Sequence, residues 1–187
     1  MPIHKSGDVN DPVNYRGIAI SDCLSKVFTS IINDRVYNHM SDNNLWNPNQ
    51  NGFMKKCRTE DNIFILHTLF QKYIKIKKQK LHVAFIDLKK FFDTINRDML
   101  RYKLIKHGIT GNTYNVLKAA YTNTMYAVRT KDRPLSNFFK SEIGVKQGCN
   151  LSPTLSNIFQ NDLANCFNEH CDPVDCLLYT SPSPRDA

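Results

Sequence analysis

The chain has 187 residues, enough for one domain with a hydrophobic core or for part of a larger domain. Its 25 Lys and Arg residues outnumber its 17 Asp and Glu residues, and the formal charge of +8 favours an anionic partner such as nucleic acid, with an ordinary basic surface as the alternative. No apolar run approaches the roughly 18 residues of a membrane span, and the N-terminus has no signal-peptide core, so no membrane partner is expected.

The first half of the chain predicts an extended segment followed by two helices. Residues 1–20 are polar and contain turn residues. An amphipathic helix is expected from about Asp22 to Met40, with Ser21 or Asp22 as its cap. Thr59 is the expected cap of a second helix that ends in the lysine-rich segment 75–80. The stripe of the first helix, which we expect to be core, comprises Leu24, Val27, Phe28, Ile31, Ile32 and Val36. The apolar face of the second comprises Ile63, Leu66, Phe70 and Tyr73 or Ile74.

A buried strand is predicted next. Residues 81–86 carry Val, Phe and Ile at both alternating positions, as in a strand buried on both faces. Asp87 follows directly. Because a carboxylate at the end of an apolar strand is costly unless something binds it, Asp87 is a candidate metal ligand.

The following segment predicts two more helices and a hairpin. A helix over 97–107 is expected, with Asn96 as its cap and Gly108 as its stop. The other expected elements are a helix over 112–121 and a hairpin of 125–130 with 137–143.

A glycine-containing loop then leads into a last helix. Gly144 and Gly148 permit close backbone approach to a ligand, and Pro153 suits the first turn of a helix. Such a loop can serve an anionic or planar ligand, although this pattern alone is a weak signal.

Four stretches in this order resemble the reverse transcriptase domain of non-LTR, LINE-like retrotransposons. They are residues 2–8 with Asn14-Tyr15-Arg16, residues 50–53, residues 85–93 and residues 144–153. The resemblance covers about residues 2–174. It implies an RNA-directed DNA polymerase, a nucleotidyltransferase that uses an RNA template, a DNA primer and dNTPs. No pattern indicates the oligomeric state.

The resemblance also implies a fold. We expect an α+β chain with the right-hand polymerase arrangement, comprising part of the fingers and an incomplete palm with an antiparallel sheet. The expected division is fingers over residues 1–80 and palm over residues 81–175. Asp87 would lie at a strand end of the palm sheet.

The resemblance assigns Asp87 to the first catalytic aspartate, which in the family holds two Mg²⁺ ions together with two later aspartates. The six cysteines form no Cys-x-x-Cys pair and no metal quartet, so they do not compete for this role. Their pattern indicates reduced thiols in an intracellular protein, in the cytoplasm, the nucleus or both.

Further matches concern the nucleotide. Phe92 matches the ring that excludes a 2′-hydroxyl, with a core phenylalanine as the alternative, and Asp93 matches a structural or hydrogen-bonding position. The residues expected to bind dNTP are Lys5, Arg16, Phe92, Gln147 and Gly148. Ser152 and Pro153 are expected to open the helix that supports template and primer.

The sequence departs from the family after residue 175. The family's Tyr-x-Asp-Asp hairpin is absent, since Pro182 and Pro184 follow Tyr179 where aspartates are needed. Residues 176–187 look like one reading frame of a sequencing adapter, so we predict a non-native tail. We therefore expect this chain, as written, to lack polymerase activity.

Other classes fit the sequence less well. A non-catalytic nucleic-acid-binding remnant of a retroelement is the alternative function. A viral RNA polymerase is disfavoured by Gln147-Gly148 followed by Ser152-Pro153. A group II intron maturase-like or telomerase-like relative is disfavoured by the N-terminal Asn14-Tyr15-Arg16 motif.

Overall fold

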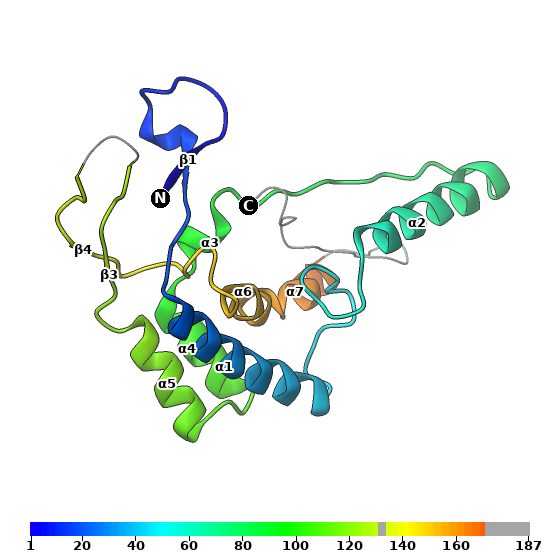
Figure 1. Cartoon of the computed structure of the whole chain (residues 1–187). Helices are drawn as coiled ribbons and strands as arrows, with labels where there is room; N and C mark the ends of the chain where they lie inside the picture. Colours follow the sequence, from blue (N-terminus) through cyan, green and yellow to red (C-terminus); the bar gives the residue numbers. More distant parts are fainter. Residues whose placement is uncertain (131–133, 171–187) are drawn as a thin grey trace. The chain divides into compact units, whose positions relative to one another are not determined.

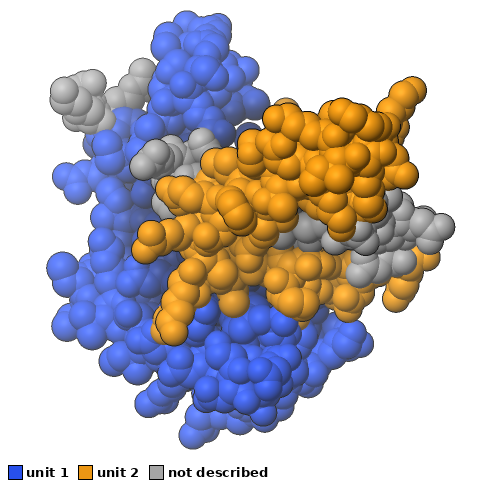
Figure 2. Space-filling view, turned by 90° about the vertical axis from the view of Figure 1, so that its right-hand side faces the viewer, with its two compact units in different colours: residues 1–46, 90–160, 187 blue, residues 47–89, 161–186 orange. Residues whose placement is uncertain are grey.

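The computed structural model describes residues 1–130 and 134–170 (Figure 1). These residues form two compact units, coloured in Figure 2. Unit 1 comprises Met1–Trp46 and Lys90–Gln160, and unit 2 comprises Asn47–Lys89 with the segment that begins at Asn161. No helix of the described part is long and apolar enough to cross a membrane. The predicted non-native tail lies outside the described residues.

Unit 1 begins with a small antiparallel sheet, so the expected extended segment is confirmed. Strand β1 (Pro2–His4) pairs with β2 (Tyr15–Gly17), and Ile3 lies opposite Arg16. The short 3-10 helix η1 (Pro12–Asn14) precedes β2. It is capped by Asp11, whose carboxylate accepts a hydrogen bond of 2.9 Å from the backbone of Val13.

The first predicted helix is confirmed as α1 (Cys23–Asp42). Asp22 caps it, because the Asp22 carboxylate accepts a 2.7 Å hydrogen bond from the backbone of Ser25. The predicted core stripe is wrong for the first half of the helix. Ile32 and Val36 are buried, whereas the exposed members are Leu24, Val27, Phe28 and Ile31. Helical spacing identifies an apolar face but not the length over which other elements cover it.

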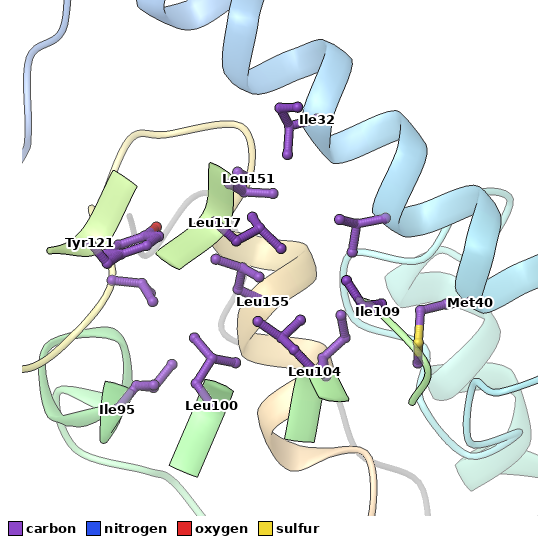
Figure 3. Packing of buried hydrophobic residues seen from close by; sticks show 13 residues of the cluster. Ile32, Met40, Ile95, Leu100, Leu104, Ile109, Leu117, Tyr121, Leu151 and Leu155 are labelled. Atoms are coloured by element: carbon purple, nitrogen blue, oxygen red, sulfur yellow. The ribbon is translucent and has the colours of Figure 1, made fainter. Parts of the chain in front are cut away.

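The core of unit 1 lies among α1, α4 (Arg97–Lys106), α5 (Gly111–Tyr121) and α6 (Ser152–Gln160). Figure 3 shows its side chains. Its members include Ile32, Met40, Leu100, Leu104, Ile109, Leu117, Leu151 and Leu155. The predicted cap and stop of α4 are confirmed: the Asn96 side chain accepts hydrogen bonds from the backbone at its N-terminus, and Gly108 has a φ of +77°.

The predicted hairpin is confirmed in a shorter form. Strand β3 (Met125–Tyr126) pairs antiparallel with β4 (Phe139–Lys140). In the sequence, helices α4 and α5 come between the short helix α3 (Phe91–Thr94) and this hairpin.

Unit 2 contains α2 (Thr59–Phe70), which continues into the π-helical η2 (Gln71–Ile76), and α7 (Leu163–His170). The predicted second helix is confirmed, but its cap is Arg58 rather than Thr59. The Asp61 carboxylate accepts a 2.8 Å hydrogen bond from the Arg58 backbone, so an acidic residue inside the first turn closes this end. Of the expected apolar face, Tyr73 is buried, whereas Ile63, Phe70 and Ile74 are exposed.

The buried strand expected over residues 81–86 is wrong. This segment has no regular secondary structure, and Phe85 and Ile86 are 85% and 69% exposed. A strand needs a neighbour to satisfy its backbone hydrogen bonds, and within residues 1–130 and 134–170 no strand pairs with this segment. The described sheets are the two-stranded pairs β1-β2 and β3-β4, so the expected palm sheet with Asp87 at a strand end is wrong for this part of the chain.

Candidate nucleotide-binding site

In unit 1, the glycine loop is held against the turn that carries Phe92. The Gly144 backbone donates a 2.8 Å hydrogen bond to the carbonyl of Ile95, and the Val145 backbone donates one of the same length to Phe92. Gly144 has a φ of +77°, and a Cβ placed there would lie 2.7 Å from the carbonyl oxygen of Asp93. The close approach that the sequence suggested for Gly144 is therefore an approach to the protein's own backbone.

Gln147 joins three segments that are far apart in the sequence. Its side-chain amide donates a 3.0 Å hydrogen bond to the Asp93 carboxylate. Its carbonyl accepts a 2.8 Å hydrogen bond from the backbone of Ala19, which lies between β2 and α1. Gly148 also lies close to this segment, because a Cβ there would be 3.1 Å from the Ala19 carbonyl oxygen.

Two positively charged side chains act on Asp93 at this junction. Burial raises the pKa of the Asp93 carboxyl, while the hydrogen bond from Gln147 and the positive charges of Lys90 and Arg16 act in the opposite direction. Arg16 on β2 thus interacts electrostatically with Asp93 on α3. Positive charges beside the side-chain amide of Gln147 suit an anionic, hydrogen-bonding ligand such as a nucleotide.

Phe92 lies at the boundary between the core and the solvent. Its side chain is half-buried and packs against the core of unit 1. Its ring makes an edge contact with Phe91 at 6.2 Å between centroids. This position is compatible with both interpretations of Phe92, as a steric gate and as a core residue.

The helix predicted to open at Ser152-Pro153 is confirmed as α6. Ser152 is buried, and its hydroxyl donates a 2.6 Å hydrogen bond to the carbonyl of Lys146 in the glycine loop. Ser152 therefore fastens the start of α6 to the loop that carries Gln147. This contact gives a structural basis to the supporting role that the resemblance assigns to Ser152.

Arg97 is a buried cation that the sequence interpretation treated only as the first residue of a helix. It is 6% exposed, and burial lowers the pKa of its guanidinium. Its hydrogen bonds go to the carbonyl of Tyr121 at the end of α5, to the carbonyls of Ser141, Ile143 and Gly144 after β4, and to the Ser141 hydroxyl. The available sequence signal was a cation in the first turn of a helix, where the dipole disfavours positive charge.

Because of Tyr121, the free energy of unfolding of the chain should fall at alkaline pH. Its ring lies 5.4 Å from the Arg97 guanidinium, and its hydroxyl lies 3.5 Å from Ser152 Oγ. Burial raises its pKa from 10.0 to about 12. Because the folded state favours the neutral phenol, this pKa shift adds about 2–3 kcal/mol to the free energy of unfolding below pH 10. That stabilisation is lost as the pH rises to about 12.

Urea unfolding at several pH values between 9 and 12 measures this effect, because this range runs from below the ordinary tyrosine pKa up to the raised pKa of about 12. The free-energy difference between the wild type and Tyr121→Phe should be constant below pH 10 and shrink above it. A pH-independent difference for Tyr121→Phe would contradict the prediction.

The remaining candidates lie apart from this junction in the chain. Lys5 follows β1 and is exposed, and its backbone donates a 2.9 Å hydrogen bond to the carbonyl of Asn14. Asp87 is exposed and belongs to unit 2. The junction in unit 1 thus brings together Arg16, Phe92, Gln147, Gly148 and Ser152, with Pro153 in the first turn of α6.

A complete metal centre is not formed by the part of the chain that the structure describes. There, no three His, Cys, Asp or Glu side chains lie close enough together to hold an ion. A magnesium ion requires octahedral oxygen coordination, to which Asp87 could contribute one carboxylate. The donor set therefore does not fit the two-metal site that the resemblance implies.

Comparison with known proteins identifies the family. Residues 3–180 match the family described as reverse transcriptase (RNA-dependent DNA polymerase). The chain belongs to this family. Reverse transcriptases are nucleotidyltransferases that use a nucleic acid template and dNTPs, and they generally require a divalent metal.

Named relatives of this reverse transcriptase chain come from insect retrotransposons. It is 29% identical over 186 residues to the "Probable RNA-directed DNA polymerase from transposon BS" of Drosophila melanogaster, covering 96% of this chain and 20% of the relative. It is 27% identical over 183 residues to the "Retrovirus-related Pol polyprotein from type-1 retrotransposable element R2" of Popillia japonica, covering 96% and 23%. The chain thus spans about a fifth of the length of these relatives.

Proposed function

We propose that this chain is part of the RNA-directed DNA polymerase of a non-LTR retrotransposon, which adds dNTPs to a DNA primer on an RNA template. The junction of Arg16, Asp93 and Gln147 is the observation that carries this proposal. It unites three of the stretches by which the sequence resembles the family. The match to the family over residues 3–180 supports the same conclusion.

The proposed roles are those that the resemblance to the family assigns to the matching residues of this chain. Lys5 and Arg16 neutralise the triphosphate, and the half-buried ring of Phe92 excludes a 2′-hydroxyl. The loop of Gln147 and Gly148 lies beneath the nascent base pair, while Ser152 and Pro153 support that loop from the start of α6. The fold in this proposal is the right-hand polymerase arrangement, with fingers over residues 1–80 and palm over residues 81–175.

Asp87 is proposed as one carboxylate ligand of the divalent metal ions that the family uses. It is exposed and so accessible to a ligand, but in the described ranges it belongs to no group of three or more His, Cys, Asp or Glu side chains that could hold an ion. The Tyr-x-Asp-Asp motif that supplies further carboxylates in the family does not occur in these 187 residues. We therefore propose that the chain as written does not catalyse polymerisation.

Primer extension tests this proposal. The parent polymerase would be built from the retrotransposon sequence that surrounds this segment, and dTTP incorporation on poly(rA)·oligo(dT) would be measured with Mg²⁺. The parent enzyme should be active, and Asp87→Asn should reduce its activity about 1,000-fold, which corresponds to about 4 kcal/mol of transition-state stabilisation. The 187-residue chain alone should show no incorporation.

The control is Asp98→Asn, which removes an exposed carboxylate on α4 that pairs with Arg101 at 2.7 Å. It should leave the activity of the parent enzyme unchanged. Incorporation by the 187-residue chain, or full activity of Asp87→Asn, would contradict the proposal. A parent protein that binds the template–primer without extending it would support the alternative, a nucleic-acid-binding remnant.

A further inference from the structure

We propose that Asp93 is a positioning residue of the nucleotide site: it fixes the orientation of the Gln147 side-chain amide, so that the amide oxygen does not face the carboxylate and can accept a hydrogen bond from the nucleotide. This inference rests on the proposed function. The nucleotide would then meet a hydrogen-bond acceptor at Gln147, and a hydrogen-bond donor of the nucleotide would be recognised there.

The chemistry of the two side chains fixes the direction of the contact. An ionised carboxylate accepts hydrogen bonds and cannot donate one. The amide nitrogen of Gln147 must therefore face Asp93, as it does at 3.0 Å. Rotating the amide by 180° would place its oxygen against the carboxylate and break the bond, so only one of the two amide orientations is stable.

The backbone around Asp93 holds the carboxylate in place. The Asp93 backbone donates a 2.9 Å hydrogen bond to the carbonyl of Lys90, and its own carbonyl packs against Gly144. The neighbouring Phe92 carbonyl is bonded to the backbone of Val145. Asp93 is therefore tied to the loop of Gln147 through main-chain contacts that a change of its side chain leaves in place.

Gln147 is held at its other end as well. Its backbone carbonyl accepts from Ala19, so the residue cannot follow its side chain away from Asp93 without losing a 2.8 Å hydrogen bond. The positive charges of Arg16 and Lys90 favour the ionised form of Asp93 that accepts from the amide. The main chain thus fixes where Gln147 lies, and Asp93 fixes which end of its amide is presented.

Nucleotide binding by the full 187-residue chain tests the inference. The affinity for dTTP in the presence of Mg²⁺ would be measured by calorimetry for the wild type and for Asp93→Leu, Asp93→Asn, Gln147→Leu and the double leucine variant. Asp93→Leu and Gln147→Leu should each weaken binding about 10-fold, and the double variant should be no weaker than either. Asp93→Asn should stay within about 3-fold of the wild type, because its amide oxygen can still accept.

Two measurements distinguish positioning from folding. Thermal unfolding should show that all four variants remain folded, since the main-chain contacts of this junction persist. In NMR spectra, the side-chain amide protons of Gln147 should exchange slowly with solvent in the wild type and Asp93→Asn, and faster in Asp93→Leu. Rescue by asparagine is an outcome that a loss of folding in the leucine variant would not produce.

Different failures overturn different claims. Wild-type affinity in Asp93→Leu, additive losses in the double variant, or unchanged exchange of the Gln147 amide would each overturn the positioning role alone. Absence of dTTP binding by the wild type would reject the proposed nucleotide site, and the role of Asp93 with it.

Discussion

Replacing Arg97 by alanine should lower the free energy of unfolding of this chain by about 3–5 kcal/mol. The Arg97 guanidinium is buried and donates to the carbonyls of Tyr121, Ser141, Ile143 and Gly144 at 2.5–3.1 Å. Truncation removes all these charge-assisted hydrogen bonds at once. It also takes this donor from the buried carbonyl oxygens of Tyr121 and Gly144, which is the expensive part of the change.

Urea unfolding followed by circular dichroism measures this loss, and α4 itself offers a matched control. Arg101 lies one turn further along the helix and pairs with the exposed Asp98. Arg101→Ala should therefore change stability by less than about 1 kcal/mol. Arg97→Lys keeps the charge but not the planar fork of donors, so it should fall between the two. Equal stabilities of Arg97→Ala and Arg101→Ala would show that the hydrogen bonds of Arg97 do not stabilise the fold as predicted.

Local features of the fold were predictable from the sequence because they depend on neighbouring residues. Asp22 and Asn96 cap their helices through side-chain bonds to backbone groups no more than three residues away. Gly108 ends α4 because its left-handed backbone suits a residue without a Cβ. Even the error at Thr59 is small, since the acidic residue that closes that helix lies within its first turn.

Features that depend on distant partners were not predictable in the same way. The apolar composition of residues 81–86 predicted a buried strand, but burial requires covering elements that the composition of the segment does not specify. The exposed first half of α1 has the same cause. A periodic pattern reports the preference of a segment for a partner, whereas the burial depends on whether the partner is present.

In the candidate site too, the residue types were predictable from the sequence, whereas the contacts between distant residues were not. The resemblance identified the residue types at Arg16, Phe92 and Gln147, and the structure joins their segments. The bond between Gln147 and Asp93 spans 54 positions, and that between Arg97 and Gly144 spans 47. No periodicity links residues at such separations, so the hydrogen-bond partners of Asp93 and Arg97 emerged only from the fold.

Gly144→Ala should destabilise the chain by about 2–5 kcal/mol, by combining backbone strain with a collision. Its φ of +77° disfavours any side chain, and an added Cβ would meet the carbonyl oxygens of Asp93 at 2.7 Å and Phe92 at 2.9 Å. These atoms are main chain and cannot rotate away. Relief would require separating the loop from the turn of Phe92, which would break the bonds that Gly144 and Val145 make there.

The glycines of unit 1 allow the two contributions to be measured separately by urea unfolding. Gly111 has a φ of +62° with nothing within 4 Å of an added Cβ, so Gly111→Ala should report strain alone, about 1–2 kcal/mol. Gly17 has open space and no positive φ, so Gly17→Ala should be close to neutral. The excess of Gly144→Ala over Gly111→Ala is then the cost of the collision with the turn of Asp93. If Gly144→Ala costs no more than Gly111→Ala, the loop of Gln147 is not held against that turn, and the proposed positioning of Gln147 loses its structural basis.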